Sequence, residues 1–274
     1  MKALHAIRSA LALTIALGLA AGAAAQDWAK EKLAKSTRHQ EWVDVKAGDR
    51  TIKCFVVFPE ASQNTPAVIV IHEIFGLTDW ACGVADQLAE AGYIAIAPDL
   101  LSGKAPGGGR TPDFPQGGVG PAIQQLTAKE KQEDLNAVAD YILKVPSCNG
   151  KLAVCGFCWG GGESFRFATQ RPDLKASYVF YGALNNNEMT TATLSKAACP
   201  VYGFYGGMDN RIGATVPRTA ELMKSLGKVY EPVTYEGAGH GFMRGGEDPA
   251  GTREADKKGR TDAWTRWKEL LKKL

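Results

Sequence analysis

The 274-residue chain contains no glycine-rich segment that ends in Gly-Lys-Ser or Gly-Lys-Thr. Its triple glycine at residues 107–109 is followed by arginine, which excludes a phosphate-binding loop of that type. Histidine is scarce, with four in total, and Gly76 stands four residues after His72, where a zinc protease needs its second histidine. Other cofactor motifs are also missing, so we expect neither a metal ion nor an organic cofactor.

The chain also lacks a strong excess of positive or of negative residues. The chain has 32 Lys and Arg against 29 Asp and Glu, which gives a formal net charge of +3. Lysine-rich stretches at residues 30–35 and 257–273 include acids, and they predict solvated faces of terminal helices. A nucleic-acid surface needs a clustered excess of basic residues, so we expect no nucleic-acid partner.

Residues 1–25 have the composition of a secretory signal peptide. Two basic residues lie near the start, residues 9–21 are almost all apolar, and three alanines precede Gln26. A transmembrane anchor is the alternative, but the run is shorter than the ~20 residues that a bilayer core requires. We therefore expect cleavage, export to the periplasm or out of the cell, and no stable membrane anchor. Residues 26–274 are expected to form a single domain, as a monomer.

Beyond the signal segment, apolar runs rich in Val, Ile and Ala alternate with helix-like stretches. Such continuous runs are typical of parallel strands buried on both faces. We predict strands, the first two as a hairpin, at residues 42–45, 52–58, 67–71, 93–97, 152–155, 176–181, 201–205 and 231–235. We predict helices at residues 80–91, 129–144, 161–170, 216–226 and 261–273. The order predicts an α/β fold with a mostly parallel, doubly wound sheet and helices on both faces.

The most informative stretch surrounds Cys158. Residues 153–162 read Ala-Val-Cys-Gly-Phe-Cys-Trp-Gly-Gly-Gly, an apolar run that breaks into a thiol flanked by glycines. A strand that turns sharply into a helix needs small residues two before and two after the turn, here Gly156 and Gly160, because a Cβ there would collide with the backbone. The pattern predicts a nucleophile elbow with cysteine in the place of serine.

A nucleophilic thiol needs a base, and the base needs an acid to orient it. Asp209 follows the predicted strand 201–205, and His240 lies in a glycine-rich loop after the predicted strand 231–235. Because parallel strands end at one edge of the sheet, we expect both residues near Cys158. A lone aspartate after a strand is often only a turn or helix cap, but the chain order nucleophile, acid, histidine favours a triad.

On these motifs the chain resembles the dienelactone hydrolase family, a branch of the α/β-hydrolases with a Cys-Asp-His triad. The resemblance extends from about Trp42 to the last predicted helix. Its motifs are Gly-Phe-Cys-Trp-Gly-Gly at 156–161, Gly-Gly-Met-Asp at 206–209, His-Gly-Phe at 240–242 and His-Glu-Ile-Phe-Gly-Leu at 72–77. The resemblance implies an α/β-hydrolase fold and an enzyme that hydrolyses small-molecule carboxylic esters or lactones.

The resemblance also implies roles for residues outside the triad. It implies that Glu73 contacts the resting thiol and that the backbone N–H groups of Ile74 and Trp159 bind the oxyanion. A carboxylate beside Cys158 either opposes ionisation of the thiol or takes its proton when substrate arrives. The simpler alternative is that His72 and Glu73 cap a helix.

The resemblance further places Arg244, Tyr181 and Phe75 in the substrate pocket. Arg244 matches a family arginine that binds a substrate carboxylate, for which a guanidinium has suitable geometry, and a surface arginine is the alternative. Tyr181 fits a pocket residue or a core tyrosine. A second family arginine falls in residues 102–127, where Arg110 is the candidate. That segment is dense in glycine and proline without a helical period, which predicts a long loop at the pocket rim or a mobile surface insertion.

Two other functions stay open, and one of them comes from the six cysteines. Cys155 and Cys158 form a Cys-x-x-Cys, as in a periplasmic thiol–disulfide oxidoreductase. However, an extended chain between them separates their Cα atoms by roughly 10 Å at ~3.3 Å per residue, beyond disulfide reach. With Cys158 as a working thiol five cysteines remain, so at least one of them is unpaired. The other alternative is a non-catalytic binding protein on the same scaffold, which an intact triad disfavours.

Overall fold

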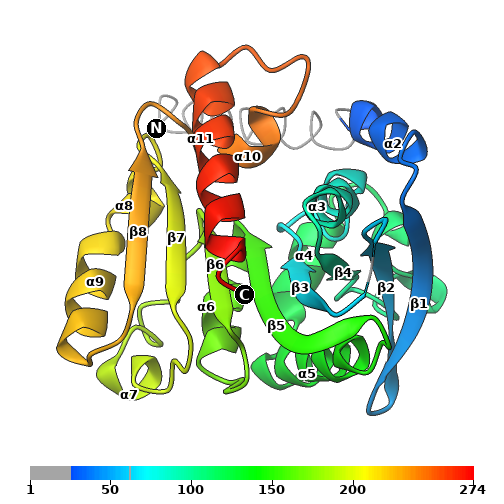
Figure 1. The fold of residues 1–274 in the computed structure, drawn as a ribbon, viewed down its shortest axis with the longest axis horizontal. Helices are drawn as coiled ribbons and strands as arrows, with labels where there is room; N and C mark the ends of the chain where they lie inside the picture. The colour runs from blue at the N-terminus through cyan, green and yellow to red at the C-terminus, as the bar shows by residue number, and fades with distance from the viewer. Residues whose placement is uncertain (1–25, 62) are drawn as a thin grey trace, which may run out of the picture.

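The computed structural model describes residues 26–61 and 63–274, so the predicted signal peptide lies outside the described residues. Eight strands form one sheet in the order β1-β2-β4-β3-β5-β6-β7-β8 (Figure 1). They are β1 (His39–Ala47), β2 (Arg50–Phe58), β3 (Thr65–Ile71), β4 (Ile94–Pro98), β5 (Cys148–Phe157), β6 (Ala176–Phe180), β7 (Val201–Gly206) and β8 (Tyr230–Tyr235). All pairs from β4 across to β8 are parallel, whereas β2 pairs antiparallel with β1 and β4. The predicted hairpin and mostly parallel sheet are confirmed.

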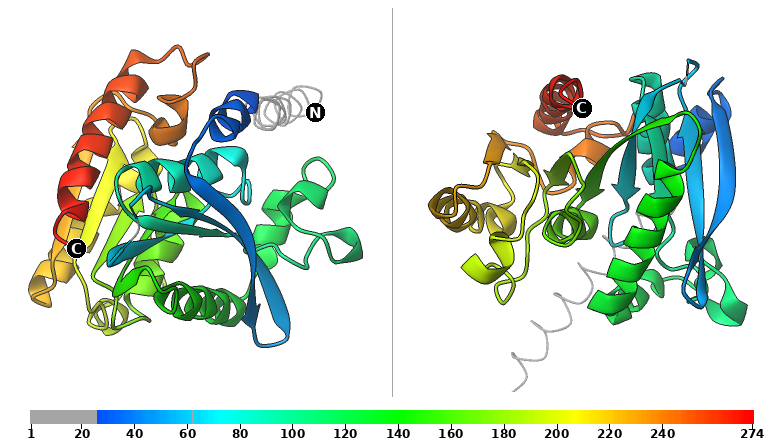
Figure 2. Two further views of the ribbon diagram at one scale, coloured as in Figure 1. Left: turned by 45° about the vertical axis from the view of Figure 1, so that its right-hand side comes forward. Right: turned by 60° about the horizontal axis from the view of Figure 1, so that its bottom comes forward.

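Helices cover both faces of this sheet (Figure 2). They are α2 (Asp27–Ala34), α3 (Asp79–Glu90), α4 (Val119–Gln125), α5 (Ala128–Leu143), α6 (Trp159–Ala168), α7 (Thr191–Leu194), α8 (Asn210–Gly213), α9 (Val216–Ser225), α10 (Phe242–Gly245) and α11 (Glu254–Leu271). One core contains Trp80 of α3 and Trp267 of α11. The other contains Leu135 of α5, Phe165 of α6 and Met223 of α9. Successive residues of the central strands alternate between the two cores, as the doubly wound prediction requires.

The structure corrects two sequence predictions. Residues 102–127 are not a loop without helical turns, because they form the 3-10 turns η1 (Pro106–Gly108) and η2 (Thr111–Asp113) and the helix α4. These pieces are too short, and too rich in glycine and proline, to show a helical period. Helix α11 begins at Glu254, earlier than the predicted residue 261, and the first residues of this helix are mostly charged and carry no apolar stripe.

The backbone is strained at Cys158, which joins β5 to α6 with φ 56° and ψ −116°. The turn presses the start of α6 against the ends of neighbouring strands. A Cβ on Gly160 would lie 2.5 Å from the carbonyl oxygen of Ile71, and one on Gly161 would lie 2.6 Å from that of Phe180. Glycine is needed at these two positions because only a residue without Cβ permits the approach.

We expect Gly160→Ala to lower the free energy of unfolding by about 1–3 kcal/mol, because the added methyl forces packed backbone apart. Gly120→Ala is the matched control. Outside its own helix α4, no atom lies within 4 Å of a Cβ built on Gly120, and alanine in place of a helical glycine is expected to be neutral or stabilising. Denaturant titration compares the two variants, and equal stabilities would contradict the close-packing account.

Candidate active site

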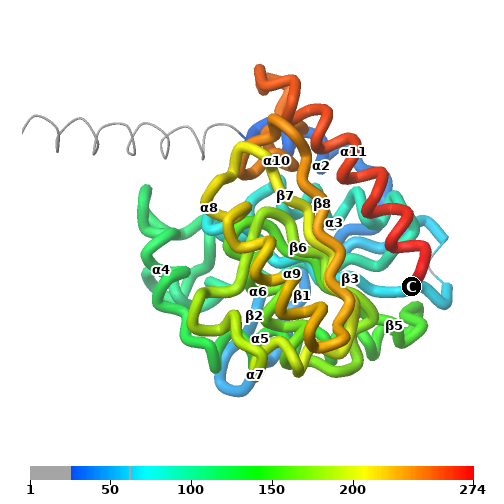
Figure 3. Tube along the Cα trace, turned by 90° about the vertical axis from the view of Figure 1, so that its left-hand side faces the viewer, coloured from blue at the N-terminus to red at the C-terminus, as the bar shows by residue number. Residues whose placement is uncertain are grey.

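Loops that follow parallel strands meet at the carboxyl edge of the sheet. Cys158 directly follows β5, Glu73 lies just after β3, Asp209 after β7, and His240 after β8. Figure 3 views the molecule from the side of β8 and labels the short helices α8 and α10, which follow β7 and β8 in the chain. A backbone hydrogen bond of 2.9 Å from Met208 to Ala238 joins the two loops. The sheet topology therefore brings together side chains that are far apart in the sequence.

The imidazole of His240 bridges the thiol and the carboxylate. Its Nε2 lies 3.0 Å from Cys158 Sγ, and its Nδ1 lies 2.5 Å from Asp209 Oδ2. Asp209 is buried, whereas 34% of the His240 side chain is exposed and Cys158 is half-buried. The three predicted triad residues thus form one hydrogen-bonded chain, which ends on a sulfur that a substrate can reach.

Asp209 has a second contact, to the helix that follows it. Its Oδ1 accepts a hydrogen bond of 3.2 Å from the N–H of Ile212 as the N-cap of α8, while Oδ2 contacts His240. The helix-cap alternative is therefore correct for one carboxylate oxygen, and the other oxygen remains available to the imidazole. The cap fixes the orientation of the carboxylate that holds His240.

The pKa of His240 is raised from its ordinary 6.5 to about 9. Burial acts to lower it, but the hydrogen bond and charge of Cys158, followed by those of Asp209, outweigh the burial. His240 is therefore a cation at neutral pH. The charged ring of His240 therefore lies in hydrogen-bond contact with the Cys158 sulfur.

Glu73 pairs with an arginine, and no hydrogen bond joins it to the Cys158 thiol, which the resemblance implied as its contact. Its buried carboxylate accepts a hydrogen bond of 2.8 Å from Arg244 Nε, while Cys158 is hydrogen-bonded to His240. The Arg244 guanidinium also lies 5.2 Å from the ring centroid of Phe75. The two residues are 171 positions apart, and the sequence did not predict this ion pair.

Tyr181 forms the wall behind the imidazole. Its ring packs edge-on against His240 and Phe242, with centroid separations of 5.2 and 5.4 Å. The residue is fully buried at φ 38°, and burial raises the pKa of its hydroxyl well above the ordinary value. Tyr181 is thus both a core residue and a neighbour of the reactive group.

Two backbone N–H groups remain available to bind an anion. Neither Ile74 N–H nor Trp159 N–H donates a hydrogen bond to the backbone within residues 26–61 and 63–274. Trp159 is the first residue of α6, whose N-terminal N–H groups have no partner inside the helix. Ile74 lies in a tight turn that is closed by a hydrogen bond of 3.1 Å from Gly76 N–H to the Glu73 carbonyl.

Arg110, the second arginine candidate, already has two partners. Its guanidinium lies 4.4 Å from the ring centroid of Trp42 and 3.6 Å from the buried Asp99 carboxylate. The next residue, Thr111, donates a hydrogen bond of 2.7 Å to Asp99 and accepts one of 3.1 Å from Leu77 N–H. Segment 102–127 is therefore anchored to the loop that follows Glu73, while Arg110 packs against strand β1.

Cys155, the partner of Cys158 in the Cys-x-x-Cys, is enclosed in the core. Cys155 is fully buried in β5, and burial raises the pKa of its thiol well above the ordinary value. All six cysteines are free thiols. An inert, enclosed Cys155 does not favour the oxidoreductase alternative.

Sequence reasoning missed an ion network beneath the elbow helix. Glu163 of α6 contacts Lys131 Nζ at 2.7 Å and also pairs with Arg166. Arg166 in turn donates a hydrogen bond of 2.5 Å to Glu188. The Glu-x-x-Arg spacing on helix α6 was a signal for the Glu163–Arg166 pair, since residues three apart face each other on a helix.

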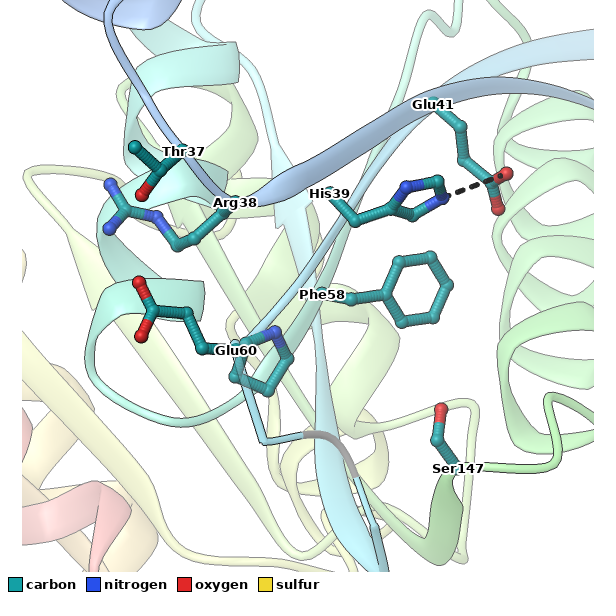
Figure 4. Close-up of a pocket in the computed structure, with 8 residues that line it drawn as sticks. Thr37, Arg38, His39, Glu41, Phe58, Glu60 and Ser147 are labelled. Carbon is teal, nitrogen blue, oxygen red and sulfur yellow. Dashed lines mark hydrogen bonds and ion pairs between the residues drawn. The ribbon is translucent and has the colours of Figure 1, made fainter.

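Two surface cavities lie away from the triad. One has a volume of about 570 Å³ and is lined by Thr37, Arg38, His39, Glu41, Phe58, Pro59, Glu60 and Ser147 (Figure 4). It lies where β1 begins and β2 ends, which is the amino edge of the parallel strands and opposite to Cys158. The other, of about 430 Å³, lies among residues 104–125. The residues that line these two cavities do not include Cys158, Asp209 or His240.

Within the described part of the chain, no group of three or more His, Cys, Asp or Glu side chains is arranged to hold a metal ion. None of the helices in residues 26–61 and 63–274 is long and apolar enough to cross a membrane.

The comparisons with known sequences agree on one family. The sequence model of the Dienelactone hydrolase family matches residues 52–274. A Salmonella typhimurium protein, provisionally named carboxymethylenebutenolidase, is 32% identical over 223 residues, which cover 77% of this chain and 78% of that protein. A Saccharolobus solfataricus protein of the same provisional name is 30% identical over 265 residues, covering 81% and 94%.

Comparison with solved structures confirms the α/β-hydrolase fold. A provisionally named dienelactone hydrolase from Klebsiella pneumoniae has a TM-score of 0.76 at 24% identity, covering 87% of this chain and all of that one. The acylaminoacyl peptidase of Pyrococcus horikoshii has a TM-score of 0.64 at 14% identity, and the match covers 89% of this chain and 43% of the peptidase. At these identities the likeness establishes the fold alone.

An NMR titration tests the charge of His240. Only three histidines, His39, His72 and His240, follow residue 25, so their ring signals can be assigned by substitution. We expect His240 to titrate near pH 9 and to move back toward 6.5 in Cys158→Ala, because the sulfur supplies the largest raising effect. The stabilisation from this raised pKa is full below pH 6.5 and is lost as the pH rises through about 9. A His240 titration midpoint near 6.5 in the unmodified protein would contradict the proposed effect of Cys158 and Asp209 on its pKa.

Proposed function

Since this chain belongs to the dienelactone hydrolase family, we propose that it hydrolyses carboxylic esters or lactones through a thioester acyl-enzyme on Cys158. The observation that carries the proposal is the chain of contacts from Cys158 to His240 and on to Asp209, at 3.0 and 2.5 Å. Family membership establishes a hydrolase of small molecules. The attacking atom and the covalent intermediate are inferred from the contacts.

In the first half of the cycle, the Cys158 thiolate attacks the ester carbonyl carbon, and the carbonyl electron pair moves onto oxygen. The N–H groups of Ile74 and Trp159 donate hydrogen bonds to this oxyanion, a contribution of commonly ~3 kcal/mol per donor. When the oxyanion collapses, the bond to the leaving oxygen breaks, and the His240 imidazolium gives that oxygen its proton. The acyl group remains on sulfur as a thioester.

In the second half, neutral His240 removes a proton from water, and the water oxygen attacks the thioester carbonyl. Collapse of the second oxyanion breaks the bond to sulfur and releases the acid. The thiolate of Cys158 and the imidazolium of His240 are thereby restored. Throughout the cycle, Asp209 holds Nδ1 and so keeps Nε2 directed at the reacting atoms.

Leaving-group chemistry limits the substrate class. The intermediate partitions toward the better leaving group, and a stabilised alkoxide or enolate competes with the thiolate far better than an amine does. An amide nitrogen needs protonation before it leaves. Ester and lactone hydrolysis is therefore favoured over peptidase activity.

Arg244 gives the pocket a cation that suits an acidic substrate. Its side chain is 27% exposed and is paired with Glu73. The name shared by the sequence relatives describes a lactone with a carboxymethylene substituent. We extend that class to this chain as esters and lactones that carry a carboxylate, with Phe75 and Tyr181 beside the acyl group. Export remains part of the proposal and is supported by the composition of residues 1–25.

Hydrolysis of an aryl ester distinguishes the proposed nucleophile from its neighbour. We expect Cys158→Ala to lose at least about 10³-fold in kcat, since removing a nucleophile from a triad abolishes covalent catalysis. Cys155→Ala is the matched control and is expected to stay within about fivefold of the parent, since Cys155 is enclosed in β5. Undiminished hydrolysis by Cys158→Ala would overturn the thioester mechanism. Insulin reduction that requires both cysteines would support the redox alternative instead.

Paired substrates test the acid-binding role of Arg244. We expect Arg244→Gln to lower kcat/KM about 10- to 100-fold more for a carboxylate-bearing ester than for its neutral analogue, since a hydrogen bond to a charged group contributes ~1.5–3 kcal/mol. Arg218→Gln removes the same charge from an arginine of α9 whose side chain is 60% exposed, and it controls for long-range effects. Equal losses on the two substrates would remove the proposed role.

A further inference from the structure

His72, directly after β3, is a fully buried side chain that the proposed cycle does not use. Its Nδ1 lies 2.8 Å from the backbone oxygen of Glu73. A carbonyl oxygen only accepts hydrogen bonds, so Nδ1 carries the proton. Burial lowers the pKa of the ring below its ordinary 6.5, which keeps the ring neutral at pH 7. Within the described residues Nε2 has no hydrogen-bond partner, so the ring makes its one hydrogen bond there to Glu73.

The oxygen that His72 holds belongs to the same peptide unit as the N–H of Ile74. Peptide units are planar, and none in the described residues is cis, so this C=O and this N–H point in opposite directions. Gly76 N–H donates to the same oxygen at 3.1 Å. Two donors therefore hold the carbonyl in place, and together they set the direction of the Ile74 N–H.

His72 also contacts the residue that supplies the other proposed donor. Its ring stacks on Trp159 with a centroid separation of 5.5 Å and an interplanar angle of 17°. Lys131 Nζ lies 5.8 Å from the centroid of the same indole. The stacked pair links the turn after β3 to the first residue of α6, so one imidazole touches both segments of the oxyanion site.

We infer that His72 is a positioning residue that aligns the two oxyanion donors, the Ile74 N–H through its hydrogen bond and the Trp159 N–H through ring packing. The inference rests on the proposed function, because it requires that an oxyanion forms. Since the oxyanion is absent from the bound substrate, misaligned donors lower kcat and leave KM nearly unchanged.

Asparagine and leucine at position 72 are a matched pair of similar size and shape. Both remove the stacked ring, but only asparagine carries an N–H near the place of Nδ1. We expect kcat on an aryl ester to be about tenfold or more lower in His72→Leu than in His72→Asn, with KM within about threefold. A fully lost donor costs ~10²–10³-fold, and Gly76 still holds the carbonyl here. If thermal melting shows that His72→Leu does not fold, the kcat of His72→Phe is compared with that of the parent. Phenylalanine keeps a ring but lacks the N–H donor.

A second measurement separates positioning from damage to the thiol. Alkylation of Cys158 by iodoacetamide involves no oxyanion, and its rate is expected to stay within about twofold of the parent in each folded variant. If the parent hydrolyses no ester, the proposed function itself fails. If the parent is active but the asparagine and leucine variants share one kcat, or if alkylation slows with kcat, the role of His72 is overturned while the function stands.

Discussion

The proposed chemistry of the carboxyl edge depends on the contact between the Cys158 sulfur and the His240 imidazole. Burial alone would make His240 a weaker base, and it becomes a cation near neutral pH because the sulfur and Asp209 both attract its positive charge. The proposed mechanism requires this cation next to the attacking sulfur. Neither residue has this property alone, so the site depends on the sheet topology that makes the loops after β5, β7 and β8 meet.

Close backbone packing holds that contact in place. The φ of 56° at Cys158 costs about 1–3 kcal/mol, and it persists because surrounding contacts determine the turn. Gly160 lets α6 begin against Ile71 at the end of β3, directly before His72. Thr111 ties Leu77, at the far end of the next loop, to the buried Asp99. The nucleophile turn and the loop that follows β3 are therefore parts of one packed unit.

The sequence alone predicted the site residues whose positions depend on local backbone geometry. Glycines around Cys158 and the strand-end positions of Asp209 and His240 are readable because a turn and a strand leave marks within a few residues. Pairing across the fold leaves no such mark. Glu73 and Arg244 form an ion pair although they are 171 positions apart. Arg110 contacts Trp42 and Asp99, and no sequence pattern marked these contacts either. The short helix α4 escaped prediction because two turns containing glycine and proline carry too little apolar periodicity.

The resting pocket is nearly balanced in charge, and this balance bears on selectivity. The cation of His240 is matched by Asp209 and the sulfur, and Arg244 is matched by Glu73. Under the proposed function, a neutral ester would leave both sets of charges undisturbed. A substrate carboxylate has to share Arg244 with a Glu73 that is only 4% exposed and has little access to water. The proposed recognition of an acid therefore requires Arg244 to bind two carboxylates at once, and the planar guanidinium, with several donors, is the side chain suited to that task.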